Sequence, residues 1–205
     1  MTPTDDESRR KLLTAAFRMP SFQTMVSRKS SITNAFVNSV IPVVKPTIEE
    51  IDQALQILGL DPADCRCVYC GDKSTEWDHL RPLVIQRRPT GFVTEIANLV
   101  PACGKCNQSK GNKPWRDWMI SKAKLSPTGR GLPNVAERLA RLEAFEKWRP
   151  PTKLDFALVV GNEEWEFDWA MCEKATDELR LCQEVANDIL KRIVERLGLD
   201  EKLLS

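Results

Sequence analysis

The sequence predicts a mostly helical α+β protein in which helical segments flank a small central module. Apolar residues recur at helical spacing in both terminal parts, whereas residues 76–85 have strand character. Within the central part, two Cys-x-x-Cys pairs begin at Cys67 and Cys103, 36 residues apart. This spacing is typical of a small motif that a zinc ion holds together.

The first 64 residues are predicted to form a helical segment. Residues 7–19 have the apolar spacing of a short amphipathic helix, and residues 30–40 form a second short helix. Thr47 and Glu50 have the spacing of a capping box, which predicts that a further helix begins there.

Residues 65–124 are predicted to form the central module. Its expected elements are a strand at 76–85, a loop at 87–91, a strand or turn at 96–101, and helices from 103 and over 114–123. Strands this short do not bury a sizeable core, which is why a metal is expected to stabilise the module.

Residues 125–205 are predicted to form a second helical segment. The expected elements are a flexible linker at 126–131, a helix at 134–148, an isolated strand at 153–160 and a long helix from about 168 to 197. An apolar stripe along the last helix consists of Cys172, Leu179, Ala186, Ile189, Ile193 and Leu197. The stripe packs against the rest of the fold or forms a dimer interface, and the sequence leaves both readings open.

The composition is that of a soluble globular protein, with 42% hydrophobic and 29% charged residues among 205. We expect no membrane segment, because no apolar run approaches the length needed to cross a bilayer. The acidic N-terminus lacks the apolar region of a signal peptide, which predicts a cytoplasmic location. In a reducing compartment, cysteines bind metals or stay free. Cys172 and Cys182 are expected to be small buried hydrophobic residues.

The net charge of +1 conceals an uneven distribution. Between Arg81 and Arg130 the chain has ten basic and only two acidic residues, which is a local charge of +8. The remainder therefore carries −7. A basic segment around a metal site indicates a polyanionic partner, most simply nucleic acid, although a solvated charged surface would give the same count.

Cys67, Cys70, Cys103 and Cys106 are the predicted zinc ligands. Four thiolates close the coordination sphere, so the expected zinc is structural. The alternative is a pair of unrelated redox turns, and Cys65 could replace one ligand.

The only histidine of the chain, His79, follows Asp78 between the two cysteine pairs. In a strand, these two side chains point to opposite sides. One can then bind a metal while the other approaches a water molecule, so His79 is a candidate general base.

These residues belong to four motifs that occur in a fixed order along the chain. The motifs are Cys67-x-x-Cys70-Gly71, Asp78-His79-x-x-Pro82, Asn98-Leu99-Val100-Pro101 and Cys103-x-x-Cys106-Asn107-x-x-Lys110-Gly111. In this order they resemble the HNH endonuclease family over about residues 65–120. The resemblance implies the ββα-metal fold, in which a two-stranded ribbon and a helix surround one catalytic divalent ion.

The resemblance also implies a role for each polar residue. Asp78 and Asn107 would be ligands of the catalytic ion, His79 the general base, and Asn98 the residue that holds the loop and helps to orient the base. The oxygen ligands suit Mg²⁺ or Mn²⁺ better than zinc. The expected phosphate contacts are Arg81, Lys105, Lys110 and Lys113. Residues 87–91 depart from the family pattern, because many members have a Gly-Gly turn there.

The resulting expectation is a metal-dependent DNA endonuclease that leaves 5′-phosphate and 3′-hydroxyl ends. The large flanking segments favour a homodimeric type II restriction endonuclease acting on double-stranded DNA. The alternatives are a phage or mobile-element nickase or structure-specific nuclease, a secreted nuclease toxin, and a zinc module that binds DNA without cutting it.

Overall fold

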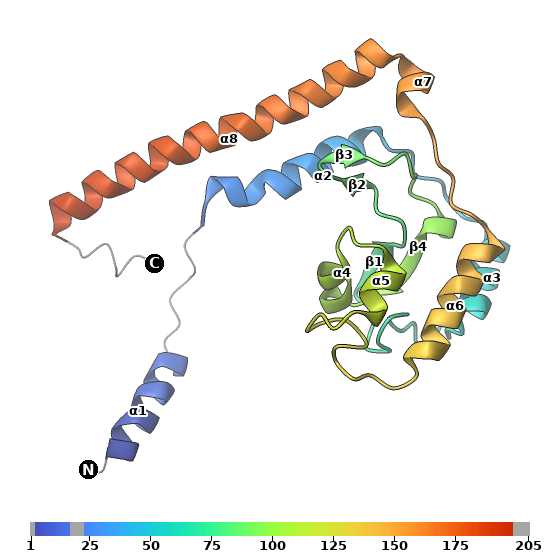
Figure 1. Ribbon diagram of the computed structural model, residues 1–205, viewed down its shortest axis with the longest axis horizontal. Coiled ribbons are helices and arrows are strands. Elements are labelled where there is room, and N and C mark those ends of the chain that lie inside the picture. The colour runs from blue at the N-terminus through green and yellow to red at the C-terminus, as the bar shows by residue number, and fades with distance from the viewer. Residues whose placement is uncertain (1–2, 17–22, 199–205) are drawn as a thin grey trace. The chain divides into compact units, whose positions relative to one another are not determined.

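The fold was obtained as a computed structural model and is described for residues 3–16 and 23–198 (Figure 1). Contacts divide the chain into two units, Ser31–Lys174 and a second unit of Met1–Ser30 with Ala175–Ser205. Helices predominate, and the strands are short, which confirms the predicted mostly helical α+β class. The three segments divided at residues 64 and 124 stay a prediction, because grouping by contacts does not test those boundaries.

The centre of the larger unit is a two-stranded ribbon followed by a helix. Strand β1 (Glu76–His79) pairs antiparallel with β4 (Leu99–Ala102), and helix α4 (Gly104–Lys110) follows β4 and packs against β1. This is the order that the resemblance implied. The expected strand ends at His79 rather than at residue 85, since Pro82 lies in the following bend.

A second hairpin occupies part of the predicted loop 87–91. Strands β2 (Val84–Ile85) and β3 (Arg88–Pro89) pair antiparallel across Gln86 and Arg87. Both turn residues have positive φ, 50° and 66°, which is the left-handed conformation required by a two-residue hairpin turn. The sequence did not indicate this turn, because neither residue is Gly or Asn.

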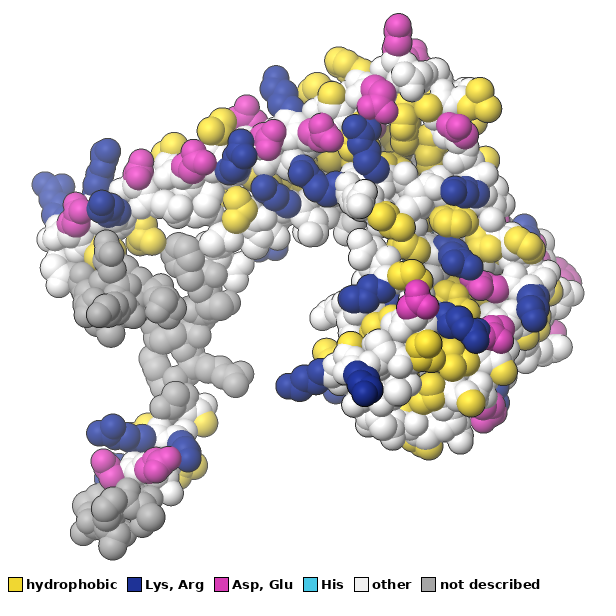
Figure 2. Space-filling view, in the orientation of Figure 1, with side chains coloured by type: hydrophobic (Ala, Val, Ile, Leu, Met, Phe, Trp, Pro, Cys, Tyr) yellow, Lys and Arg dark blue, Asp and Glu magenta, His cyan; other side chains and the backbone are white. Residues whose placement is uncertain are grey.

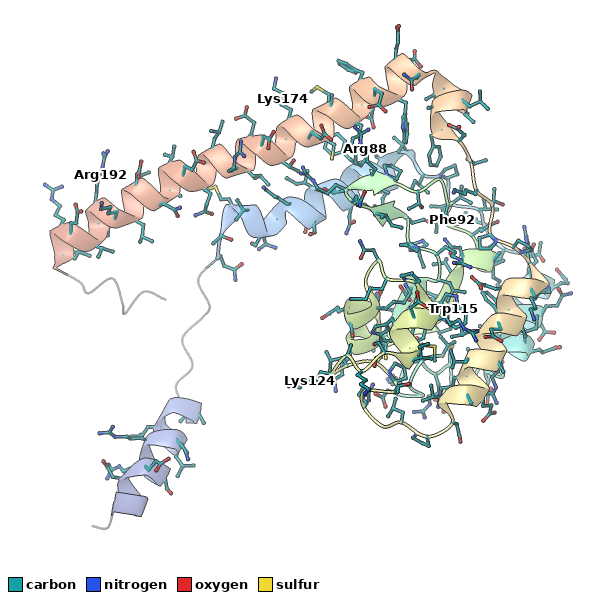
Figure 3. The ribbon with its side chains drawn as sticks, viewed as in Figure 1. Arg88, Phe92, Trp115, Lys124, Lys174 and Arg192 are labelled. Carbon is teal, nitrogen blue, oxygen red and sulfur yellow. The ribbon has the colours of Figure 1, made fainter. Side chains whose placement is uncertain are left out.

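Helices support the ribbon from one side. Helix α3 (Ile48–Leu58) begins at the predicted capping box, where Thr47 accepts from the Glu50 amide and Glu50 accepts from the Thr47 amide. It packs against α6 (Val135–Trp148), which in turn contacts α5 (Trp115–Ile120). The shared core is formed by buried side chains from these elements, including Leu58, Trp118, Leu142 and Phe145. Trp115 of α5 also belongs to this core (Figure 3).

The predicted flexible linker at 126–131 is a tight turn. The Ser126 side chain is fully buried, and its hydroxyl lies 2.7 Å from the Ser121 carbonyl oxygen and accepts from the Gly129 amide at 3.0 Å. A Cβ at Gly129 would lie 2.0 Å from the Ala123 carbonyl oxygen. Only glycine therefore fits this close approach.

A second core of the larger unit joins α2 (Lys29–Val40), α7 (Phe156–Val160) and the first part of α8 (Asn162–Leu197). Its buried residues include Val37, Val93, Trp169 and Cys172. Arg88 lies over the Trp169 ring at 5.5 Å and pairs with Glu166 of α8 at 3.1 Å (Figure 3). Cys172 is buried as expected, whereas Cys182 is exposed.

The isolated strand predicted at 153–160 is wrong. Only Lys153 makes a β-bridge, with Phe92, and residues from Phe156 form α7. Asp155 explains the difference, because its side chain accepts from the Leu158 amide and caps a helix start. Helix α8 also begins earlier than expected, at Asn162, with Glu163 and Glu164 in its first turn.

In the smaller unit, helix α1 (Pro3–Ala16) agrees with the predicted helix up to Ala16, and residues 17–19 lie outside the described residues. The 3-10 helix η1 (Met25–Arg28) precedes α2.

Acidic, basic and apolar side chains are interspersed along α8 (Figure 2). Ile189, Ile193 and Leu197 of its predicted stripe are exposed, so among the residues that the structure describes this part of the stripe is not buried. A dimer stays a prediction. Across the described ranges, no helix is both long and apolar enough to span a membrane.

Candidate active site

The four cysteines of the two pairs come together. The sulfur atoms of Cys67, Cys70, Cys103 and Cys106 all lie within 4.8 Å of one another. Cys65 is not part of this group, so the arrangement favours the four cysteines of the two Cys-x-x-Cys pairs, and the ligand set stays a prediction. Hydrogen bonds from the Cys106 and Cys70 thiols lower the pKa of Cys67, and the same hydrogen bonds raise the pKa of Cys106. Four sulfurs in this arrangement fit a tetrahedral zinc ion.

The local backbone brings the two pairs to the same place. The Gly71 amide donates to the Cys67 carbonyl at 2.8 Å in a turn where Gly71 has a φ of 80°. Cys103 is the N-cap of α4, and Cys106 lies in its first turn. The Arg130 guanidinium lies 3.9 Å from the Cys106 sulfur and stabilises negative charge on the cluster.

Asp78 is buried between β1 and α4, with 4% of its surface exposed. Its Oδ2 accepts from the Tyr69 hydroxyl at 2.5 Å, and its Oδ1 accepts from Lys110 Nζ at 3.1 Å. Burial raises the pKa of Asp78, while Lys110 and the Tyr69 hydrogen bond act in the opposite direction. Asp78 therefore offers a buried carboxylate whose two oxygens are both engaged.

The position of Lys110 differs from the expectation. This lysine was predicted to contact phosphate, but its side chain is completely buried. Nζ also donates to the carbonyl oxygens of His79 at 2.9 Å and Gly111 at 3.3 Å. Burial lowers the pKa of Lys110, and Asp78 opposes that shift. The prediction of a phosphate contact is therefore wrong for this arrangement, because three oxygen acceptors already surround the ammonium group.

His79 lies at the end of β1 and is half-buried. Its Nε2 lies 3.0 Å from the Thr94 hydroxyl. Burial, followed by the positive charge of Lys110, lowers the pKa of His79 to about 4. The ring is therefore neutral near pH 7. When Nε2 donates to Thr94, Nδ1 is the nitrogen that can accept a proton.

Asn98 is completely buried and holds the chain that follows His79. Its Oδ1 accepts from the Arg81 amide at 2.7 Å, and its Nδ2 donates to the carbonyls of Arg81 at 3.0 Å and Val93 at 3.3 Å. The Leu80 amide donates to the Asn98 carbonyl at 2.8 Å. One amide side chain thus connects both ends of the segment that contains the second hairpin.

Asn107 lies on α4 and donates through Nδ2 to Glu76 Oε2 at 2.7 Å. Glu76 is a site residue that the sequence interpretation missed. The signal was present, because residues two apart in a strand share a face, so Glu76 and Asp78 lie on the same side of β1. Glu76, Asp78 and Asn107 together supply the oxygen donors that a hard divalent cation prefers. Tyr69 and Thr94 were also missed.

The other predicted phosphate contacts have different surroundings. Lys105 and Lys113 are exposed on and just after α4, as a phosphate contact requires, although Lys113 Nζ also donates to the Ser109 carbonyl at 2.8 Å. Arg81 instead pairs with Glu146 of α6 at 2.6 Å. The two residues line an open cavity of about 510 Å³ together with Arg116, Glu143 and Lys147. A phosphate at Arg81 would therefore share the guanidinium group with Glu146 or displace this carboxylate.

Comparison with known families identifies the central part of this site. Residues 67–113 match the sequence model described as HNH endonuclease. These residues form an HNH domain. The match begins at Cys67 and ends after α4, so the HNH domain contains the cysteine cluster, β1, β4, Asp78, His79, Asn98, Asn107 and Lys110, whereas Arg130 and Glu146 lie outside it.

Two curated relatives share the HNH domain. The CRISPR-associated endonuclease Cas9 of Corynebacterium diphtheriae is 42% identical over 59 residues, which cover 27% of this chain and 5% of the relative. The Cas9 of Actinomyces naeslundii is 32% identical over 97 residues, which cover 45% of this chain and 8% of the relative. The chain therefore spans less than a tenth of the length of either protein. No solved structure matches it.

Proposed function

We propose that this chain is a metal-dependent DNA endonuclease that hydrolyses phosphodiester bonds at the HNH domain. One observation carries the proposal: His79, held by Thr94, directly follows the buried Asp78 in β1, and α4 brings Asn107 to Glu76, which shares a face of β1 with Asp78. Hydrolysis of a phosphodiester needs a base for the attacking water and positive charge near the phosphate. The match to the HNH family supports both requirements.

His79 is the proposed general base. Because Thr94 holds Nε2, the ring has one orientation, and Nδ1 can take the proton of the attacking water. Asn98 keeps the backbone after His79 in place, so loss of Asn98 would move the base rather than remove it. A base that is uncharged at pH 7 is available without a prior deprotonation step.

Asp78 and Asn107 are the proposed ligands of Mg²⁺ or Mn²⁺, and Glu76 lies close enough to Asn107 to take part. The Lys110 ammonium group already lies against the Asp78 carboxylate, so a divalent ion would have to share this carboxylate with Lys110 or displace Lys110 from it. When bound, a divalent ion would supply charge stabilisation for the phosphate and the leaving 3′ oxygen. The four cysteines would hold zinc separately, because thiolates select a softer ion.

DNA is the proposed substrate, and the product ends are 5′-phosphate and 3′-hydroxyl. The exposed Lys105 and Lys113 next to the site support a polyanion. The expected type II restriction role is not what the relatives suggest, since both are CRISPR-associated endonucleases. Restriction, double-strand cleavage and a homodimer stay predictions.

A plasmid assay tests the proposal directly. Purified full-length protein should convert supercoiled DNA to open-circular or linear product with Mg²⁺, and not without it. The Asp78→Asn and His79→Ala variants, prepared in parallel, control for contaminating nucleases. Cleavage that persists equally in both variants would refute the assignment of the HNH domain as the active site. DNA binding without cleavage by the unaltered protein would favour a non-catalytic zinc module.

A further inference from the structure

Tyr69 connects the two metal sites of the HNH domain physically. It is the only tyrosine of the chain and lies between the cluster residues Cys67 and Cys70. Its side chain is completely buried. The ring meets Trp118 edge-on, with centroids 5.2 Å apart and an interplanar angle of 88°.

The backbone around Tyr69 is held on both sides. The Val68 amide donates to the Pro101 carbonyl of β4 at 3.0 Å, and the Cys67 amide donates to the Asp72 carbonyl at 2.9 Å. These backbone hydrogen bonds, the Trp118 contact and the burial of the side chain together restrict rotation of the Tyr69 ring. Its hydroxyl position therefore follows from the geometry of the cysteine cluster.

That hydroxyl donates to Asp78 Oδ2 at 2.5 Å, and Lys110 donates to Oδ1 at 3.1 Å. Hydrogen bonds to charged groups are shorter and stronger than neutral ones. Lys110 Nζ also lies 3.1 Å from Oδ2, so Lys110 contacts both oxygens and Tyr69 distinguishes Oδ2 from Oδ1. Rotation of the carboxylate about its bond to Cβ would break the buried hydrogen bond to Tyr69. Tyr69 and Lys110 thus fix the plane of the carboxylate from two sides.

We propose that Tyr69 is a positioning residue, which holds the Asp78 carboxylate in the orientation that the catalytic cation needs. Tyr69 thereby makes the nuclease site dependent on the four-cysteine cluster. This inference rests on the proposed function, because it takes Asp78 as a cation ligand. In a purely structural role, the hydrogen bond to Asp78 would only satisfy the buried Tyr69 hydroxyl. In the proposed positioning role, the same hydrogen bond also affects cation binding by Asp78.

The single tyrosine permits a direct measurement. Full-length protein labelled with 3-fluorotyrosine should give one ¹⁹F resonance, and this resonance reports on the Tyr69 hydroxyl. We expect Mg²⁺ to shift the resonance in a saturable way, since a cation on Asp78 changes the charge that the phenol faces. The Asp78→Asn variant should show no such shift. Calorimetry on the same samples measures Mg²⁺ binding independently of Tyr69.

A variant series separates positioning from packing. Tyr69→Phe removes only the hydroxyl, and Trp118→Phe removes part of the ring contact while leaving the hydroxyl in place. We expect Tyr69→Phe to raise the Mg²⁺ concentration for half-maximal binding and cleavage by about tenfold, the effect of losing one hydrogen bond to a charged group. Trp118→Phe should leave this concentration within about twofold of wild type. The zinc-to-protein ratio and the unfolding temperature are measured for every variant.

The outcomes distinguish failure of the positioning role of Tyr69 from failure of the nuclease proposal. If wild-type protein binds Mg²⁺ but the fluorine resonance does not move, or if Tyr69→Phe keeps wild-type Mg²⁺ affinity, the positioning role is overturned and the nuclease proposal stands. If Trp118→Phe loses as much Mg²⁺ affinity as Tyr69→Phe, packing explains the effect and the role is again overturned. Wild-type protein that neither binds Mg²⁺ nor cleaves DNA would overturn both proposals.

Discussion

The side-chain amide of Asn107 on α4 donates to the carboxylate of Glu76 on β1 at 2.7 Å. This contact joins the helix and the strand of the HNH domain at the place where the proposed cation ligands lie. Asn107 has one oxygen, so the hydrogen bond through Nδ2 leaves Oδ1 directed elsewhere. Glu76 therefore orients Asn107 as well as adding negative charge next to Asp78.

Asn107→Ala should abolish cleavage or raise its Mg²⁺ requirement, because a proposed ligand oxygen is lost. Glu76→Gln should raise the requirement less, by about tenfold, since the amide still accepts from Asn107 but carries no charge. A Mg²⁺ titration of plasmid cleavage measures both. Glu137→Gln is the matched control, because Glu137 pairs with Arg141 on the surface of α6. An unchanged Mg²⁺ requirement in both site variants would remove this pair from the cation site.

His79→Ala should lower the cleavage rate by about 10²–10⁴-fold, the usual contribution of a general base. DNA binding and zinc content should stay near the wild-type level, because the histidine holds neither. Single-turnover cleavage and a filter-binding assay measure the two properties. Thr94→Val, which removes the hydroxyl next to Nε2, should cause a smaller loss of about tenfold. Residual cleavage by His79→Ala within about tenfold of wild type would exclude His79 as the base.

Cys103→Ser should prevent folding rather than reduce activity selectively. Structural zinc contributes on the order of 10 kcal/mol of binding free energy to a small motif, and one of four ligands is lost. We expect insoluble or zinc-depleted protein, measured by metal analysis and circular dichroism. Cys65→Ser is the matched control, since Cys65 lies two residues from Cys67 but outside the cluster. Full zinc occupancy in Cys103→Ser would show that the ligand set is wrong.

Brief EDTA treatment should stop cleavage, and added Mg²⁺ or Mn²⁺ should restore it without further zinc. The reason is that thiolates hold zinc tightly, whereas a few oxygen ligands release a hard cation readily. Zinc content measured before and after treatment provides the control. Recovery with zinc alone, and never with Mg²⁺ or Mn²⁺, would contradict the assignment of two separate metal sites.

Lys110→Met should destabilise the metal-free protein by about 3 kcal/mol, because it leaves the buried Asp78 carboxylate without its ion pair. A divalent cation would restore the missing positive charge. We therefore expect Mg²⁺ to raise the unfolding temperature of Lys110→Met more than that of wild type. Differential scanning calorimetry with and without Mg²⁺ measures the difference. If Mg²⁺ raised the unfolding temperature of both proteins equally, Lys110 would not be part of the cation site.

The cysteine cluster and the order β1, β4, α4 could be predicted because they depend on spacing along the chain. Thiolate pairs and the residues that follow them have few geometric solutions once they share one ion. Capping chemistry was equally local, and Thr47 with Glu50 behaves as the sequence indicated. Asp155 caps α7 by the same local chemistry. The partial alternation of polar and apolar residues over 153–160 instead suggested a strand, and that prediction was wrong.

The surroundings of the site could not be predicted in the same way. A lysine is rarely buried completely, so the sequence favoured a surface role for Lys110. Its burial depends on the Asp78 carboxylate and the His79 carbonyl, which lie more than 30 residues earlier in the chain, together with the carbonyl of the adjacent Gly111. Thr94 and Glu146 likewise reach His79 and Arg81 only through tertiary contacts. The hairpin turn at Gln86 and Arg87 lacks the residue types that usually signal it.

Helix α4 has only seven residues, yet it contains Cys106, Asn107 and Lys110. Successive residues of a helix point about 100° apart, so neighbours in sequence serve different sides of the HNH domain. Inserting or deleting one residue between Cys103 and Lys110 would rotate everything beyond it by that angle. A change before Cys106 would misdirect the cluster sulfur, the amide and the ammonium group together, and a change after Asn107 would misdirect the ammonium group of Lys110. Length variation in relatives of this domain is therefore expected in the loops around α4 and not within it.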